Sequence, residues 1–239
     1  MMEHTLQNKI KQAIGKFAAD LVMDGMIVGL GTGSTSACFI ESLAIRCSQG
    51  LKIRAIATSQ KSTDLAKSKG IPILDMEDVV QIDLTIDGAD EIDHQKRLIK
   101  GGGGALLREK IIATSSKEMI VIVDESKIVK DLGAFGLPVE IIPFCYKTTL
   151  HKLSKIGFTG KLRTNPDGTF YITDNSNYIV DIHFDPVCRD PEKAYTLIRC
   201  ITGVVDIGFF FHIAKRVVVG YADGSVKIYA GDELPFKTG

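Results

Sequence analysis

The chain has 239 residues, of which 45% are hydrophobic and 24% are charged, and 29 Lys and Arg balance 29 Asp and Glu. This composition suits a packed globular protein, and the balanced charge argues against an extended binding surface for DNA, RNA or an anionic membrane. No apolar run is long enough to span a bilayer, and five scattered cysteines without a C-x-x-C pair favour reduced thiols. We therefore expect a cytoplasmic protein with no nucleic acid partner and no membrane partner.

The first half of the chain alternates predicted helices with short apolar strands. The predicted helices lie at residues 1–20, 36–46, 62–69 and 105–115. The predicted strands lie at residues 26–30, 53–58, 71–74, 83–86, 97–99 and 119–123. This alternation predicts a mostly parallel sheet that helices cover on both faces.

The second half has a different order of elements. Strands are predicted at residues 139–142, 160–163, 178–184 and 204–211, and helices at 147–155 and 191–200. This βαββαβ order is typical of the ferredoxin-like split unit. Two last strands, residues 216–221 and 226–229, form a predicted hairpin that rejoins the first sheet.

Together these elements predict an α/β fold with a Rossmann-like, mostly parallel sheet domain and an inserted, smaller ferredoxin-like α+β domain. We expect the sheet domain to comprise residues 1–134 and 212–239. The insertion, residues 135–211, is expected to act as a lid and an oligomerisation domain, because its apolar strands invite contacts between subunits.

A run of four glycines, residues 101–104, precedes the predicted helix 105–115. Bare backbone N–H groups and a helix N-terminus suit an anion, and Lys100 adds a positive charge. Glu109 falls inside the apolar arc of that helix, where a carboxylate must be paired or take part in chemistry. The alternative is a mobile hinge, with Glu109 as the structural partner of a buried arginine.

The segment Gly29-Leu-Gly-Thr-Gly-Ser34 matches a dinucleotide fingerprint only weakly, because it ends in serine, and it lacks the lysine of a P-loop. A hydroxyl-rich turn between strand and helix fits better. Thr32, Ser34, Thr35 and backbone N–H groups there could hold a small phosphate at the helix N-terminus. A capping turn without a ligand remains the alternative.

Carboxylates follow two other predicted strands. Asp87 and Asp90 come after the strand 83–86, where they could act as acid and base, hold Mg²⁺, or form an Asp-Gly turn with a helix cap. Lys127 follows the strand 119–123 and either points into the same crevice or lies on the surface. Four segments thus place a phosphate cradle, carboxylates and two lysines at the carboxyl ends of strands, which suits proton transfer on a small phosphorylated carbonyl compound.

These motifs, in this order and spacing, resemble the type A family of ribose-5-phosphate isomerases. The matching segments are residues 31–35, 87–90, 100–103, 108–110, 124–127 and 137–140. The resemblance is dense over residues 26–142 and looser beyond, notably at 209–215. It implies the reversible conversion of D-ribose 5-phosphate to D-ribulose 5-phosphate through an enediolate, in the non-oxidative pentose phosphate pathway. It also implies no cofactor. We expect no metal, because the sequence offers no supporting ligand set beyond the Asp87 and Asp90 pair, and we expect a homodimer or homotetramer.

The resemblance also implies roles for single residues. Glu109 would be the base that moves a proton between C2 and C1, Lys100 would stabilise the enediolate oxygen, and Asp87, with Asp90 beside it, would serve ring opening. The implied substrate-binding residues are Thr32, Gly33, Ser34, Thr35, Gly88, Ala89, Gly101, Gly102, Gly103 and Lys127. Burial would raise the pKa of Glu109, whereas Lys100 and Arg108 would lower it, so the net direction stays open at this point.

Two other classes of protein remain. A sugar-responsive regulator would bind a sugar phosphate without catalysis, but it needs a DNA-binding segment for which this sequence leaves no room. A dinucleotide-dependent oxidoreductase is disfavoured by the missing third glycine. It is also disfavoured by Arg54, which stands where an acidic partner of the ribose is expected.

Overall fold

The computed structural model describes residues 2–235, apart from the side chains of residues 2–5 and 76. Its largest sheet has six strands in the order β13-β12-β6-β3-β1-β2, all parallel except the β12–β13 hairpin. These strands are β1 (Ile27–Leu30), β2 (Arg54–Ala57), β3 (Leu84–Asp87), β6 (Met119–Asp124), β12 (Ala214–Gly220) and β13 (Val226–Tyr229). The predicted parallel sheet and the returning hairpin are confirmed.

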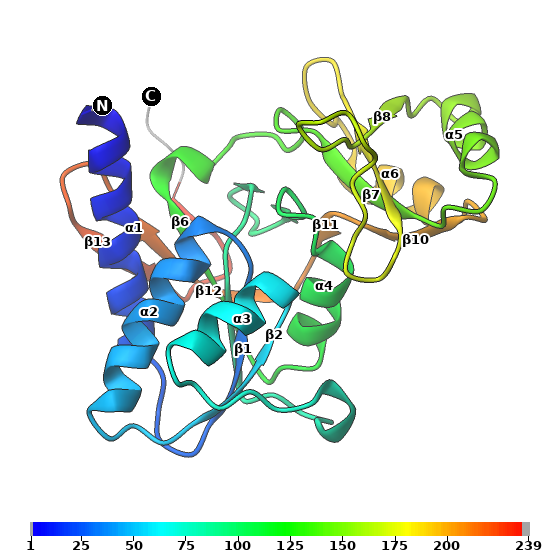
Figure 1. Ribbon diagram of the computed structural model, residues 1–239. Helices are drawn as coiled ribbons and strands as arrows, with labels where there is room; N and C mark the ends of the chain where they lie inside the picture. The colour runs from blue at the N-terminus through cyan, green and yellow to red at the C-terminus, as the bar shows by residue number, and fades with distance from the viewer. Residues whose placement is uncertain (1, 236–239) are drawn as a thin grey trace.

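Helices cover both faces of this sheet because its central strands are apolar on both sides. Those helices are α1 (Met2–Asp20), α2 (Ser34–Ser48), α3 (Gln60–Ser68) and α4 (Leu106–Thr114). Figure 1 shows α1 and α2 side by side, and they share one core with Ile122 of β6. Val121 of the same strand faces the opposite core together with Ala113 of α4. Successive side chains of β6 thus pack into cores on opposite faces of the sheet, and this packing on both faces fixes the position of the strand ends.

The inserted segment forms a second sheet of four antiparallel strands in the order β10-β7-β9-β8. Its elements are β7 (Leu137–Ile141), α5 (Tyr146–Lys155), β8 (Gly160–Leu162), β9 (Tyr178–Ile182), α6 (Pro191–Arg199) and β10 (Val204–Ile207). This is the expected ferredoxin-like arrangement, and it lies to one side of the parallel sheet (Figure 1). The exact limits of the insertion stay a prediction.

A small third sheet joins the two units. It consists of β4 (Glu91–Ile92), β5 (Leu98–Ile99) and β11 (Phe209–Phe210), all antiparallel. Two 3₁₀ helices, η1 (Met76–Asp78) and η2 (Glu125–Lys127), complete the described elements. No helix within residues 2–235 is long and apolar enough to cross a membrane.

Two predicted strands differ from the observed elements. Residues 71–74 make only an isolated bridge to Ala55, because Pro72 has no N–H group to donate to a ladder. The predicted strand 204–211 is divided at Gly208 between β10 and β11. A Cβ atom at Gly208 would lie 2.4 Å from the carbonyl oxygen of Lys100. The close approach of these two backbone segments therefore requires glycine.

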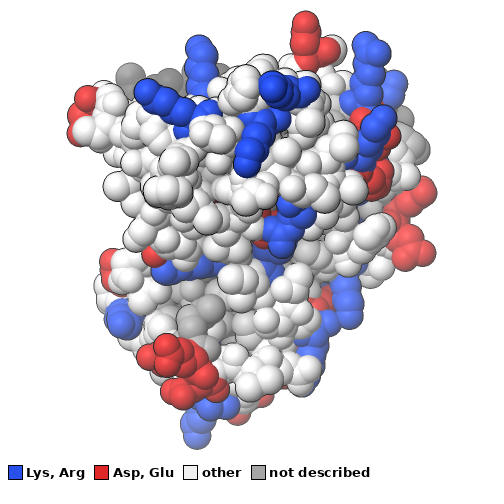
Figure 2. Space-filling model, turned by 90° about the vertical axis from the view of Figure 1, so that its right-hand side faces the viewer, with Lys and Arg blue, Asp and Glu red and all other residues white. Residues whose placement is uncertain are grey.

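Charge is unevenly distributed on the face that Figure 2 shows. Basic side chains gather at the top, over the inserted unit, and a group of acidic side chains lies at the lower left. The balanced net charge of the whole chain therefore conceals local groups of one sign.

Candidate active site

Three buried ionisable side chains meet at the carboxyl edge of the parallel sheet. Lys100 follows β5, Asp87 ends β3, and Glu109 lies in the first turn of α4. The Lys100 Nζ atom lies 2.8 Å from Asp87 Oδ2 and 3.4 Å from Glu109 Oε2, and all three side chains are at most 3% exposed. Lys100 Nζ also donates to the carbonyl oxygen of Gly88 at 2.7 Å. The cluster is therefore an ammonium group held between two carboxylates out of contact with bulk water.

Backbone and hydroxyl donors fix the other oxygen of Asp87. Its Oδ1 accepts hydrogen bonds from the N–H groups of Thr32 (3.0 Å) and Gly88 (2.7 Å) and from Ser36 Oγ (3.2 Å). Gly31 leaves room for this carboxylate, because a Cβ atom there would lie 2.0 Å from Asp87 Oδ1. The turn after β1 thus positions a side chain that comes from β3.

The glycine run approaches the site from the opposite side. The N–H of Gly102 donates to Asp90 Oδ2 at 2.7 Å, and the N–H of Gly104 closes a turn on the carbonyl of Gly101 at 2.9 Å. Gly101 and Gly104 adopt φ angles of 105° and 81°, which favour glycine. The run therefore forms an ordered turn that holds Asp90 and leads into α4.

A cavity of about 150 Å³ connects this cluster with the N-terminus of α2. Most of the candidate residues line it: Thr32, Gly33, Ser34, Thr35, Gly88, Ala89, Asp90, Lys100, Gly101, Gly103, Glu109 and Lys127. Asp87 and Gly102 lie behind this lining, Asp87 against Lys100 and Gly102 against Asp90. The structure thus brings all the predicted candidates to one place.

Three residues at the site were not singled out from the sequence. Lys11 and Gln7 of α1 line the cavity, and Lys11 Nζ donates to Ser34 Oγ at 3.0 Å. The third is Ser36, which binds Asp87. Ser36 continues the hydroxyl-rich turn, which is a signal in the sequence. The spacing of four residues places Gln7 and Lys11 on one side of a helix, but it does not show that this side faces the site.

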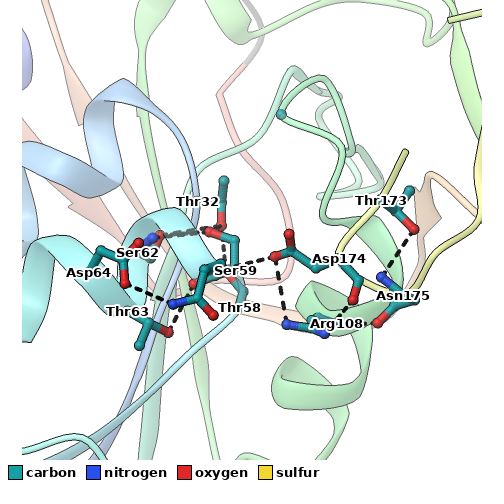
Figure 3. Close-up of polar contacts among 12 residues, drawn as sticks. Thr32, Thr58, Ser59, Ser62, Thr63, Asp64, Arg108, Thr173, Asp174 and Asn175 are labelled. Carbon is teal, nitrogen blue, oxygen red and sulfur yellow. Dashed lines mark hydrogen bonds and ion pairs between the residues drawn. The ribbon is translucent and has the colours of Figure 1, made fainter. Parts of the chain in front are cut away.

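Thr32 uses its hydroxyl group away from the cavity. Its Oγ1 lies 2.7 Å from Thr58 Oγ1 and donates to Ser59 Oγ at 2.8 Å, and Ser59 Oγ donates to Ser62 Oγ at 3.1 Å (Figure 3). We call Thr32, Thr58, Ser59 and Ser62 the hydroxyl cluster. It ties the turn after β1 to the N-terminus of α3.

Burial dominates the acidity of Glu109. It raises the pKa of Glu109 to about 8, against the positive charge of Lys100 and with the help of the negative charges of Asp87 and Asp90. Burial also disfavours the ammonium form of Lys100, but Asp87 and Glu109 outweigh it and hold the pKa of Lys100 above its ordinary value. The Arg108 side chain is bonded to Asp174 and Asn175. Of the three influences expected on the pKa of Glu109, burial and Lys100 therefore remain.

This arrangement defines an α/β enzyme with a cavity for a small anionic substrate. At one end the Glu109 carboxylate, with a raised pKa, faces the Lys100 ammonium group, and at the other end Lys11 contacts Ser34 at the N-terminus of α2. No group of three or more His, Cys, Asp or Glu side chains that could hold a metal ion occurs in the described part of the chain.

Comparisons with known proteins also identify an enzyme family. The model of the family described as ribose 5-phosphate isomerase A (phosphoriboisomerase A) matches residues 54–224. Ribose-5-phosphate isomerase A of Protochlamydia amoebophila is 50% identical over 222 residues, which cover 93% of this chain and 96% of that protein. The chain therefore belongs to the ribose 5-phosphate isomerase A family.

Solved structures of the family have the same fold. Ribose 5-phosphate isomerase from Plasmodium falciparum superposes with a TM-score of 0.90 at 39% identity, covering 94% of this chain and 99% of that one. The enzyme from Methanocaldococcus jannaschii superposes with a TM-score of 0.86 at 38% identity, covering 93% and 98%. The match extends over both sheets, so the looser sequence resemblance beyond residue 142 does not mark a different fold.

Proposed function

We propose that this chain interconverts D-ribose 5-phosphate and D-ribulose 5-phosphate, the sugar phosphate in the names of its relatives. The observation that carries the proposal is the buried cluster of Lys100, Asp87 and Glu109 at one end of a cavity whose other end suits a phosphate. Nothing in the comparisons favours a sugar-binding regulator that lacks catalysis.

Glu109 acts as the base in this proposal. The C–H group next to a carbonyl is a weak acid, and its loss places negative charge on the carbonyl oxygen. A carboxylate with a pKa raised to about 8 can take the proton from C2 and return it to C1, because its basicity lies near physiological pH. Lys100 supplies positive charge where the enediolate oxygen forms, in a place from which water is excluded.

Asp87 and Asp90 serve the sugar oxygens. The Lys100 ammonium and three further donors hold Asp87 in one orientation, which suits a group that passes protons during ring opening. Asp90 lines the cavity and is held by the N–H of Gly102. Gly88, Ala89, Gly101 and Gly103 border the part of the cavity that the sugar would occupy.

The phosphate binds at the N-terminus of α2. Ser34 and Thr35 present backbone N–H groups of the first helical turn, which lack partners within the helix. Lys11 and Lys127 reach the same end of the cavity from α1 and η2. This anchoring leaves the reacting carbons near Lys100 and Glu109.

The proposal includes no cofactor and no metal, because Lys100 supplies the positive charge that a metal ion would otherwise supply. It also places the protein in the cytoplasm, which suits its five free cysteines. We further infer a homodimer or homotetramer, since apolar side chains lie exposed on the inserted unit.

The variant Glu109→Gln tests the assignment of the base. Gln keeps the size of the side chain, so the affinity for ribose 5-phosphate should stay within about threefold while kcat falls by at least ~10²-fold. In deuterated water the wild-type protein should place deuterium at C1 of the ketose, and the variant should do so only at its residual rate. A folded Glu109→Gln protein with near-normal kcat would exclude Glu109 as the base.

A further inference from the structure

The connection between β8 and β9 reaches from the antiparallel sheet to the helices that carry the site. Within it, residues 173–177 form a tight turn, in which the N–H of Ser176 donates to the carbonyl of Thr173 and the N–H of Thr173 to the carbonyl of Asn177, both at 2.9 Å. Figure 3 shows Asp174 of this turn on the side of the hydroxyl cluster, with Arg108 of α4 close to Asp174 and Asn175. We call residues 173–177 the bridging turn.

A buried carboxylate fixes the shape of the bridging turn. Glu140 of β7 is fully buried, and its Oε1 accepts hydrogen bonds from Thr173 Oγ1 (2.9 Å), Asn175 Nδ2 (3.1 Å) and Asn177 Nδ2 (2.9 Å). A carboxylate without water needs such donors, and here all three come from the turn. The turn therefore keeps one conformation although Asp174 at its tip is partly exposed.

The bridging turn holds α4 through Arg108, the residue before Glu109. Arg108 Nε donates to Asn175 Oδ1 at 2.8 Å, and Arg108 Nη2 donates to the carbonyl oxygen of Asp174 at 2.7 Å. On the other side of Glu109, Lys110 Nζ donates to Asp206 Oδ1 at 3.0 Å and to the carbonyl of Ile207 at 2.6 Å. The inserted unit thus holds the helix on both sides of the base.

The bridging turn also holds α3, and through it the surroundings of Asp87. Asp174 Oδ2 accepts a hydrogen bond from the N–H of Gln60, the first residue of α3, at 2.8 Å. Ser59 caps the same helix and belongs to the hydroxyl cluster, which contains Thr32. The N–H of Thr32 in turn donates to Asp87 Oδ1. Three hydrogen bonds, linked through the backbone of Ser59 and Gln60 and through Thr32, therefore connect Asp174 to Asp87.

We propose that the bridging turn is a positioning element for the reaction, with Asp174 and Asn175 holding Glu109 through Arg108 and Asp87 through α3. This inference rests on the proposed function. The ion pair of Arg108 and Asp174 is 34% and 38% exposed at 3.6 Å, so it contributes little to stability. Its removal changes the geometry of the site more than the folding of the protein, which makes the role measurable.

The variant Asp174→Ala removes the acceptor for the N–H of Gln60 and the ion pair with Arg108, and it keeps the backbone carbonyl that accepts from Arg108 Nη2. In protein that remains folded, kcat for ribose 5-phosphate should fall about 10-fold, because small displacements of a catalytic group slow proton transfer. The KM should change less than about threefold, since Lys11, Lys127, Ser34 and Thr35 bind the phosphate from other elements. The conservative variant Asp174→Asn retains an acceptor oxygen and should recover most of kcat.

Asp167→Ala is the matched control in the same connection. Within the described part of the chain, Asp167 accepts side-chain hydrogen bonds from Thr169 of its own turn alone, at 2.9 Å and 2.6 Å, and the change to Ala should leave kcat unchanged. In a double-mutant cycle, Arg108→Ala combined with Asp174→Ala should slow the reaction by less than the product of the single effects, because both act on α4.

Three results would overturn the inference: an unchanged kcat in Asp174→Ala, an equal loss in Asp167→Ala, or a rise in KM alone. Failure of the underlying function would look different, because the wild-type protein would then not convert ribose 5-phosphate at all. Thermal unfolding of each variant verifies that the comparison is made on folded protein.

Discussion

Asp87, Lys100 and Glu109 carry two negative charges and one positive charge when all are ionised, and both carboxylates lie within 3.4 Å of the buried Lys100 ammonium group. Burial disfavours the net negative charge of this cluster. Glu109 therefore binds a proton more readily here than in water, and the proton neutralises the excess charge. The raised pKa of Glu109 therefore follows from the same burial that excludes water from the enediolate.

This acidity predicts a pH profile. In the proposed mechanism Glu109 must be ionised to accept a proton, and its pKa is raised to about 8, so kcat/KM should rise about tenfold per pH unit below that value and level off above it. Initial rates with ribose 5-phosphate from pH 5 to 9 would measure the profile. The phosphate group itself titrates near pH ~6, which separates its effect from that of Glu109. A profile already level at pH ~5.5 would contradict a raised pKa.

The two lysines that we propose bind the phosphate, Lys11 and Lys127, give a second prediction at this scale. Lys11→Ala and Lys127→Ala should each raise KM about 10-fold and change kcat much less, because a hydrogen bond to a charged group contributes about 1.5–3 kcal/mol. Lys9→Ala is the matched control, since Lys9 is exposed on the same helix and does not line the cavity. An effect of Lys9→Ala as large as that of Lys11→Ala would show a general loss of positive charge instead of a specific contact.

At the scale of elements, the segments that form the site could be predicted from the sequence. The directions of single side chains could be predicted less well. The strands, the turn after β1 and the glycine run were predictable because their periodicity and glycines are local signals. Lys11 was not, because the polar side of α1 becomes part of the site only when the helix packs against α2. The hydroxyl of Thr32 and the guanidinium of Arg108 turn away from the cavity toward partners that are distant in sequence.

The turn after β1 allows a prediction about backbone space. Gly31→Ala would place a methyl group 2.0 Å from Asp87 Oδ1, so Asp87 must move and lose its donors. Overpacking of this kind costs about 1–3 kcal/mol, which lowers Tm by roughly 2–12 °C in a chain of this size. The protein should remain folded and still lose activity, because a displaced Asp87 also loses its contact with Lys100.

Gly231→Ala is the control for that substitution. A Cβ atom at Gly231 has no neighbour within 4 Å, so both Tm and kcat should stay at wild-type values. Calorimetry and initial rates on the two variants make the comparison. A Gly31→Ala protein with normal activity would mean that the position of Asp87 is not needed for the reaction.

At the scale of the whole molecule, the active site draws on both units. The inserted unit supplies the bridging turn, and Arg163 from the end of β8 donates to the carbonyl oxygens of Gly101 (2.8 Å) and Gly102 (3.1 Å). The parallel sheet supplies the ionisable groups and the phosphate end. A ferredoxin-like unit is recognisable from its βαββαβ order, but contacts between two units depend on loop conformations that the sequence pattern does not encode.

The inserted unit also carries the exposed apolar side chains that support the predicted oligomer. Phe144 is 82% exposed, Ile172 61%, Ile142 47% and Phe170 40%. The ring of Phe170 meets that of Tyr146 at 5.8 Å, which brings the two segments of this patch together. Monomeric proteins rarely expose such a group, and a second copy of the chain would cover it symmetrically.

Sedimentation at micromolar concentration should therefore show a dimer or tetramer, and Phe144→Glu should shift it toward the monomer, because the charge would be buried without a partner. Val80→Glu is the matched control, since Val80 is 94% exposed in a loop far along the chain from this patch, and it should leave the assembly intact. Phe144 does not line the cavity, so the Phe144→Glu protein should keep kcat within about threefold of wild type. A monomeric wild-type protein, or an unchanged oligomer in Phe144→Glu, would show that this patch is not the interface.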